Sequence, residues 1–133
     1  MDDADAREQV TILRATDDAI HHLGVDVVAV SAGSVELALT VKPTMVNGHR
    51  VLHGGYLFLL ADTAFAYCCA SVGRASVTRT ADIAFLASAS IGTRITAIAE
   101  VRVAQARATI CDVRIEADGV CLAEFRGQGL LTG

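Results

Sequence analysis

The sequence predicts an α+β fold in which a curled antiparallel sheet wraps around one long central helix. The first observation is that residues 54–72 are apolar on every side, with Asp62 as the only carboxylate between Arg50 and Arg74. A helix of this kind has to be covered on most sides. The second observation is that the segments around this helix alternate apolar and polar residues between short turns, which favours antiparallel strands.

Composition limits the kinds of protein to which this chain can belong. Its 133 residues are enough for a single domain, residues 1–133, with a hydrophobic core. A net charge of −4 argues against nucleic acid as a partner. Hydrophobic residues make up 53% of the chain, more than a domain of this size can bury, so we expect an oligomer. The four cysteines lack CxxC spacing and the acidic start lacks a signal-peptide core, which predicts reduced thiols in a cytoplasmic protein.

The chain before the central helix is expected to form one helix and one hairpin. Residues 3–23, within an N-terminal helical segment 1–23, have a thin apolar stripe at helical spacing, and Gly24 is a plausible stop. Residues 25–30 and 34–41 are expected to pair as strands, because apolar side chains alternate with polar ones in the second of them. A loop then leads directly into the central helix.

Four further strands are expected after the central helix, over residues 76–86, 93–103, 109–117 and 120–131. The last two are predicted to form a hairpin around Asp118-Gly119.

The central run itself is about as long as a bilayer span, roughly 20 residues. Asp62 at its middle would be costly in a membrane, so we expect a buried core helix and no membrane partner.

Groups able to perform acid–base chemistry gather around the start of the central helix. Gly54 and Gly55 would let a substrate approach the first helical N–H groups, which have no partner within the helix. These N–H groups lie at the positive end of the helix dipole, where a developing oxyanion is stabilised. Asn47 and His53 precede them, although Asn47 also suits a plain turn and His53 a helix cap.

The spacing between Gly54 and Asp62 predicts a site shared by two subunits. Eight residues separate them, which is about 12 Å along a helix axis. One substrate carbonyl cannot contact both groups of a single helix. If two copies place these helices antiparallel across a two-fold axis, Asp62 of one copy comes beside Gly54 of the other.

A motif around the helix start resembles the signature of the hotdog-fold acyl-CoA thioesterases. It reads Asn47-Gly48-His49-x3-His53-Gly54-Gly55-x6-Asp62. Residues 60–67 resemble the phenylacetic acid degradation (PaaI-type) branch in particular, and the resemblance extends over about residues 20–131. It implies a hotdog fold and a homotetramer, a dimer of dimers that hydrolyses acyl-CoA to free acid and CoA. Its substrates would be (hydroxy)phenylacetyl-CoA-like or short-to-medium acyl-CoA thioesters. Thioester hydrolysis needs no metal, and the chain has no cofactor motif.

The resemblance also implies roles for individual residues. The Gly54 N–H would polarise the thioester carbonyl, and Asp62 of the partner subunit would be the general base for water or the nucleophile. Asn47 would hold the attacking water or the carbonyl, and His53 would position the loop and the Gly54 amide. The substrate-binding residues would be Gly55, Tyr56 and Thr78, with Thr80 as the runner-up to Thr78.

Two other functions compete with hydrolysis. One is a hotdog dehydratase acting on acyl thioesters, and the other is a non-catalytic protein that binds acyl-CoA.

The chain also departs from the family on the strand after the central helix. It has Phe85-Leu86-Ala87-Ser88 where the family often has a Phe-Leu-Arg-Pro-like segment. The missing arginine and proline leave no arginine of this chain assigned to the CoA phosphates.

Overall fold

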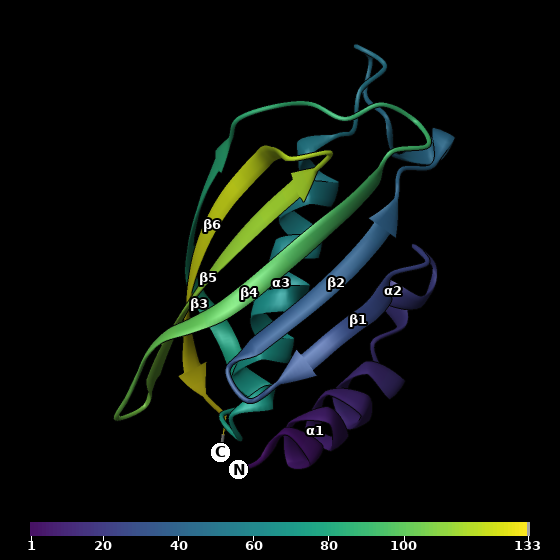
Figure 1. Cartoon of the computed structure of the whole chain (residues 1–133). Helices are drawn as coiled ribbons and strands as arrows, with labels where there is room; N and C mark the ends of the chain where they lie inside the picture. The colour runs from purple at the N-terminus through teal and green to yellow at the C-terminus, as the bar shows by residue number, and fades with distance from the viewer. Residues whose placement is uncertain (133) are drawn as a thin grey trace.

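A computed structural model describes residues 1–132, which form a six-stranded antiparallel sheet curled around helix α3 (Gly54–Ser71) (Figure 1). The strands lie in the order β1-β2-β4-β5-β6-β3, so β1 and β3 are the two edges of the sheet. Their bounds are β1 (Asp26–Ser31), β2 (Ser34–Thr40), β3 (Ser76–Phe85), β4 (Arg94–Gln105), β5 (Ala108–Ala117) and β6 (Val120–Leu131). The predicted α+β architecture is confirmed, with strand bounds within two residues of those expected.

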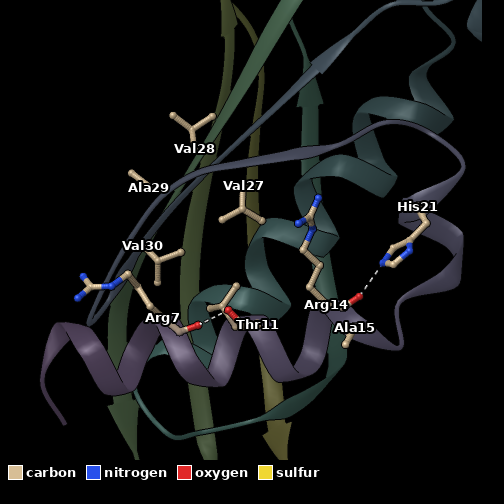
Figure 2. Close-up of a pocket in the computed structure, with 10 residues that line it drawn as sticks. Arg7, Thr11, Arg14, Ala15, His21, Val27, Val28, Ala29 and Val30 are labelled. Carbon is tan, nitrogen blue, oxygen red and sulfur yellow. Dashed lines mark hydrogen bonds between the residues drawn. The ribbon is translucent and has the colours of Figure 1, made fainter.

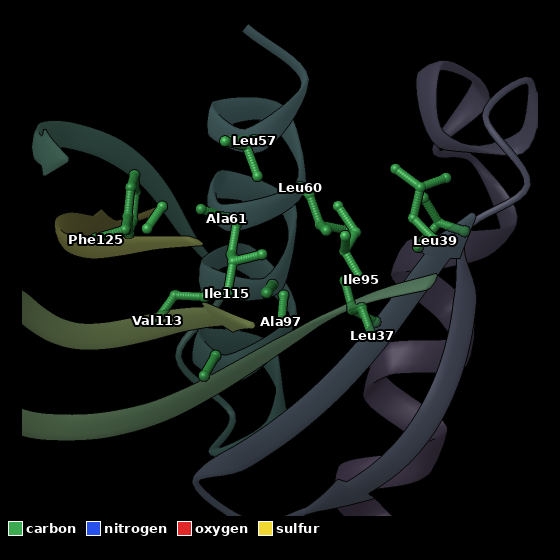
Figure 3. Close-up of a cluster of buried hydrophobic side chains, with 14 of the residues drawn as sticks. Leu37, Leu39, Leu57, Leu60, Ala61, Ile95, Ala97, Val113, Ile115 and Phe125 are labelled. Atoms are coloured by element: carbon green, nitrogen blue, oxygen red, sulfur yellow. The ribbon is translucent and has the colours of Figure 1, made fainter. Parts of the chain in front are cut away.

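The core lies between α3 and the concave face of the sheet. Leu57, Leu60 and Ala61 of α3 point toward apolar side chains of β2, β4, β5 and β6 (Figure 3). Burying one such aliphatic side chain stabilises the fold by about 1.5–3 kcal/mol. All four cysteines are free, and three of them lie in or beside this core. Within residues 1–132, no helix has both the length and the hydropathy needed to cross a bilayer.

The N-terminal helix differs from the prediction, because the expected helix over 3–23 is broken into α1 (Asp3–Ala15) and α2 (Asp18–His21). The break frees Asp17, whose carboxylate accepts a 2.8 Å hydrogen bond from the hydroxyl of Tyr67 on α3. Burial and this bond to Asp17 raise the pKa of Tyr67 above its ordinary value. His21 bonds the carbonyl of Arg14 in the last turn of α1 at 2.9 Å, and the backbone N–H of Asp17 donates to the same carbonyl at 3.1 Å.

Two glycines of β6 allow α3 to approach the sheet closely. A Cβ at Gly127 would lie 2.8 Å from Cδ1 of Phe65, and one at Gly129 would lie 3.0 Å from its Cζ. Phe65 is fully buried on α3, three residues after Asp62. These glycines therefore help to set the distance between the part of α3 that carries Asp62 and the sheet.

Gly127→Ala is expected to lower the free energy of unfolding by about 1–3 kcal/mol, because the added methyl overpacks a site filled by Phe65. Urea denaturation followed by circular dichroism measures this loss. Gly48→Ala is the matched control, since a Cβ there would meet nothing within 4 Å. Equal loss in the two variants would contradict the packing account.

Candidate functional site

The loop before α3 is held by Asn47. Its side-chain oxygen Oδ1 accepts hydrogen bonds from the backbone N–H of His49 at 2.9 Å and of Val51 at 3.4 Å. Its backbone N–H donates to the carbonyl of Val51 at 2.8 Å. These are the bonds of an Asx turn, so the Asn47 oxygen is occupied by the loop itself. The Nδ2 group of Asn47 has no acceptor among residues 1–132 and is available to a ligand.

His53 is the N-cap residue of α3 and is exposed to solvent. Its Nδ1 accepts a 2.9 Å hydrogen bond from the backbone N–H of Gly55, which requires the ring proton to lie on Nε2. The amide that His53 holds is therefore that of Gly55, whereas the sequence analysis expected Gly54. In the described part of the chain, the N–H of Gly54 finds no acceptor. The helix thus begins with one capped amide and one open amide.

A hollow of about 370 Å³ lies beside this open amide. It is lined by Leu52, Gly54, Leu57, Phe85, Leu86, Ala87 and Ser88. The segment 85–88, which departs from the family pattern, therefore forms one wall of the hollow at the start of α3. A Cβ at Gly54 would lie 3.2 Å from Cε1 of Phe85, so the ring of Phe85 lies over the first residue of the helix. Phe85 was not predicted to lie here, because the contact depends on the curl of the sheet and leaves no local sequence pattern.

Asp62 lies half-buried on α3, two turns beyond Gly54, and faces strand β3. Its Oδ1 accepts a 2.6 Å hydrogen bond from the hydroxyl of Thr78. A short bond to a carboxylate fixes the side-chain rotamer and leaves Oδ2 for other groups. The structure therefore brings two of the predicted site residues, Asp62 and Thr78, into direct contact.

A β-bulge determines which threonine of β3 meets Asp62. The pairing of β3 with β6 shifts at Arg79, so Thr78 lies opposite Gly129 and Thr80 opposite Gln128. Gly129 faces the core, and Gln128 faces the outside of the sheet together with Thr80. Thr80, the runner-up in the sequence analysis, is therefore turned away from Asp62. Bulges often re-aim a side chain beside a functional site.

One stripe of α3 is left uncovered by the chain's own sheet. Tyr56, Leu59, Asp62 and Ala66 are half-buried there, and Phe58 is exposed. Apart from Asp62, this stripe consists of apolar or aromatic side chains on a helix whose other faces are in the core. Gly54 and Asp62 of one chain are too far apart along the axis, about 12 Å, to contact the same carbonyl.

Three of the chain's arginines have partners in the fold that compete with binding to a nucleotide phosphate. Arg74 donates to the hydroxyl of Thr109, Arg102 pairs with Asp112, and Arg107 donates to the carbonyl of Leu131. Within residues 1–132, no three His, Cys, Asp or Glu side chains come close enough together to hold a metal ion.

Comparison with known proteins places this geometry in a family. The model of the thioesterase superfamily matches residues 49–122. Acyl-coenzyme A thioesterase PaaI of Escherichia coli is 39% identical over 117 residues, which are 84% of this chain and 84% of that protein. A putative esterase of Deinococcus radiodurans is 35% identical over 107 residues, which are 79% of this chain and 73% of that protein.

Solved structures agree with this match. The Escherichia coli PaaI protein from the phenylacetic acid degradation operon superposes with a TM-score of 0.96 at 35% identity, covering 98% of this chain and 96% of that one. A mutant of the phenylacetic acid degradation protein PaaI from Thermus thermophilus superposes with a TM-score of 0.84 at 26% identity. The match covers 87% of this chain and 100% of that one. The chain therefore belongs to the thioesterase superfamily and has the hotdog fold that its sequence predicted.

Proposed function

We propose that this protein hydrolyses acyl-CoA thioesters to a free carboxylic acid and CoA. The observation that carries the proposal is the Asp62 carboxylate, fixed by Thr78 on the uncovered stripe of an otherwise apolar helix. The open N–H of Gly54 at the start of the same helix supplies a donor for an oxyanion. Membership of the thioesterase superfamily, and a relative named as an acyl-coenzyme A thioesterase, support thioester hydrolysis as the chemistry.

The proposed reaction uses Gly54 of one subunit and Asp62 of the partner subunit. The Gly54 N–H donates to the thioester oxygen, while Asp62 takes a proton from the attacking water. The tetrahedral intermediate then expels CoA as a thiolate, which takes up that proton. In the alternative, the carboxylate itself attacks and forms an anhydride, which water then hydrolyses. In both routes the carbon–sulfur bond breaks and the acyl group leaves as a carboxylic acid.

The uncovered surfaces support a site of this kind at a two-fold interface. The apolar stripe of α3 lies next to the open edge of β3, which is hydrogen-bonded to β6 alone. More than half of the surface of Val77, Phe85 and Leu86 is exposed along or just beyond this edge. A second copy that pairs along β3 would cover both surfaces and bring the two helices together. We propose a homotetramer built from two such dimers.

The remaining predicted residues have positions that suit the proposed site. Asn47 presents Nδ2 toward an attacking water or the carbonyl, and His53 keeps the first turn of α3 in place through the Gly55 amide. Tyr56 is half-buried on the uncovered side of α3 and would line the substrate site. The mostly apolar hollow beside Gly54 suits a (hydroxy)phenylacetyl or a short-to-medium acyl group.

Thr78→Val is expected to lower kcat about tenfold or more with little change in KM, because a hydrogen bond to a charged group contributes about 1.5–3 kcal/mol. Thr80→Val makes the same change on the outer face of the sheet and should leave kcat close to wild type. Steady-state kinetics on one acyl-CoA substrate compares the two variants. An equal loss of kcat in the two variants, or a change in KM alone for Thr78→Val, would show that Thr78 does not position Asp62 for catalysis.

The test of the proposed function is the release of free CoA thiol from a panel of thioesters. The panel contains phenylacetyl-CoA, hydroxyphenylacetyl-CoA, benzoyl-CoA and a series of straight-chain acyl-CoAs. Thiol release from a saturated acyl-CoA supports hydrolysis, and the order of rates identifies the acyl class. Dehydration of a hydroxyacyl-CoA without thiol release would favour the dehydratase, and binding without turnover would favour a non-catalytic acyl-CoA-binding protein.

A further inference from the structure

A second hollow lies between α1 and the edge strand β1. Its volume is about 410 Å³. It is lined by Arg7, Val10, Thr11, Arg14, Ala15, His21, Val27, Val28, Ala29 and Val30. Figure 2 shows the valines of β1 above α1, with the guanidinium of Arg14 directed upward from the helix. We call this hollow the α1–β1 groove. Because β1 and β3 are opposite edges of the sheet, the groove is separate from the proposed catalytic site.

Arg14 has an incomplete set of hydrogen bonds in this groove. Its Nη2 donates to the carbonyl of Val25 at 3.0 Å, but its buried Nε has no acceptor in the described residues. The neighbouring carboxylate of Asp17 accepts from Tyr67, and Arg14 forms no ion pair within residues 1–132. The guanidinium of Arg14 is therefore not neutralised by any carboxylate of the described chain, and a carboxylate is the acceptor that best fits a guanidinium.

The charges of the groove complement an anion. Arg7 and Arg14 both line it, and none of its lining residues is acidic, although the chain as a whole has a net charge of −4. The remaining wall is formed largely by aliphatic side chains of β1, with Val28 51% exposed. A ligand that fits has one carboxylate and an apolar body.

We propose that the α1–β1 groove binds a medium-chain aliphatic monocarboxylate, with its carboxylate on Arg14 and its chain along Val27, Val28 and Val30. Val27 and Val30 are three residues apart, about 10 Å along an extended strand, which suits an extended chain of about eight carbons. No aromatic side chain lines the groove, so stacking does not favour an aryl acid. This site does not depend on thioester hydrolysis.

Isothermal titration of the full-length protein with sodium octanoate tests the proposal. Val28→Glu places a carboxylate on the exposed wall and is expected to weaken octanoate binding at least tenfold. Ile12→Glu is the matched control, because Ile12 is 59% exposed on α1 and is outside the lining of the groove. It should change the dissociation constant less than twofold. Octanol, which lacks the charge, should not bind at concentrations where octanoate saturates.

Three results would overturn the proposal. The first is an absence of octanoate binding to the wild type, and the second is equal weakening in Val28→Glu and Ile12→Glu. The third is a change of oligomeric mass in Val28→Glu by light scattering, which would show that a second copy of the chain covers the groove. Thermal unfolding of both variants verifies that they are folded. Arg14→Gln then tests the anchor, with weaker octanoate binding expected.

Discussion

Asp62→Asn is expected to lower kcat for acyl-CoA hydrolysis at least about a hundredfold, since a general base usually contributes about 10²–10⁴-fold. Asparagine preserves the size of the side chain and its oxygen can still accept the hydrogen bond from Thr78. It cannot take a proton from water, nor can it act as a carboxylate nucleophile. Thiol release under substrate saturation measures the loss, and KM should change little because the shape of the site is kept.

Asp82→Asn is the matched control for this variant. Asp82 is exposed on β3, lies opposite Arg126 and lies on the outer face of the sheet. Asp82→Asn therefore removes the same negative charge as Asp62→Asn, but away from the proposed site. Its kcat should stay near that of the wild type. Hydrolysis that is indifferent to Asp62→Asn, or that falls equally in Asp82→Asn, would rule out Asp62 as the base or nucleophile.

Gly54→Pro is expected to lower kcat about 10²–10³-fold, the usual loss when one oxyanion donor is removed. Gly54 is the first residue of α3, where proline is well tolerated because its missing N–H has no partner within the helix. The preceding residue, His53, has the extended backbone that a following proline requires, with φ −64° and ψ 133°. The substitution therefore removes the donor while preserving the helix.

Gly54→Ala separates the loss of the donor from crowding. It keeps the N–H but places a Cβ 3.2 Å from the ring of Phe85, so the ring has to move by a few tenths of an ångström to make room. We expect Gly54→Ala to retain most of the wild-type kcat, with any change mainly in KM. A similar loss of kcat in both variants would show that space beside Phe85, rather than the N–H, matters at this position.

The sequence predicted the parts of this fold that depend on local patterns. The central helix is apolar over its whole length, and the strands on either side alternate in a period of two, so their bounds were visible without any tertiary information. The same applies to the placement of His53 and Gly54 at the helix start. The spacing of Gly54 and Asp62 led further to the prediction that two chains share the site.

What the sequence could not show depends on contacts between distant residues. The break at Asp17 follows from a bond to Tyr67, fifty residues away, and no local signal marks it. The bulge at Arg79 reverses the facing of every later residue of β3, which a plain alternation of side chains does not reveal. It selects Thr78 over Thr80 as the partner of Asp62.

The central claim is that the Gly54 N–H of one subunit and the Asp62 carboxylate of the other act on the same thioester. Co-expression of Asp62→Asn and Gly54→Pro chains with different tags, followed by purification on both tags, tests it directly. A hybrid dimer then contains one site with both groups intact and one with neither. We expect each hybrid dimer to work at about half of the wild-type rate, so the doubly purified tetramers should be far more active than either variant alone. If each site were built within one chain, every site of the hybrid would keep one defect, and activity no higher than that of the separate variants would contradict the claim.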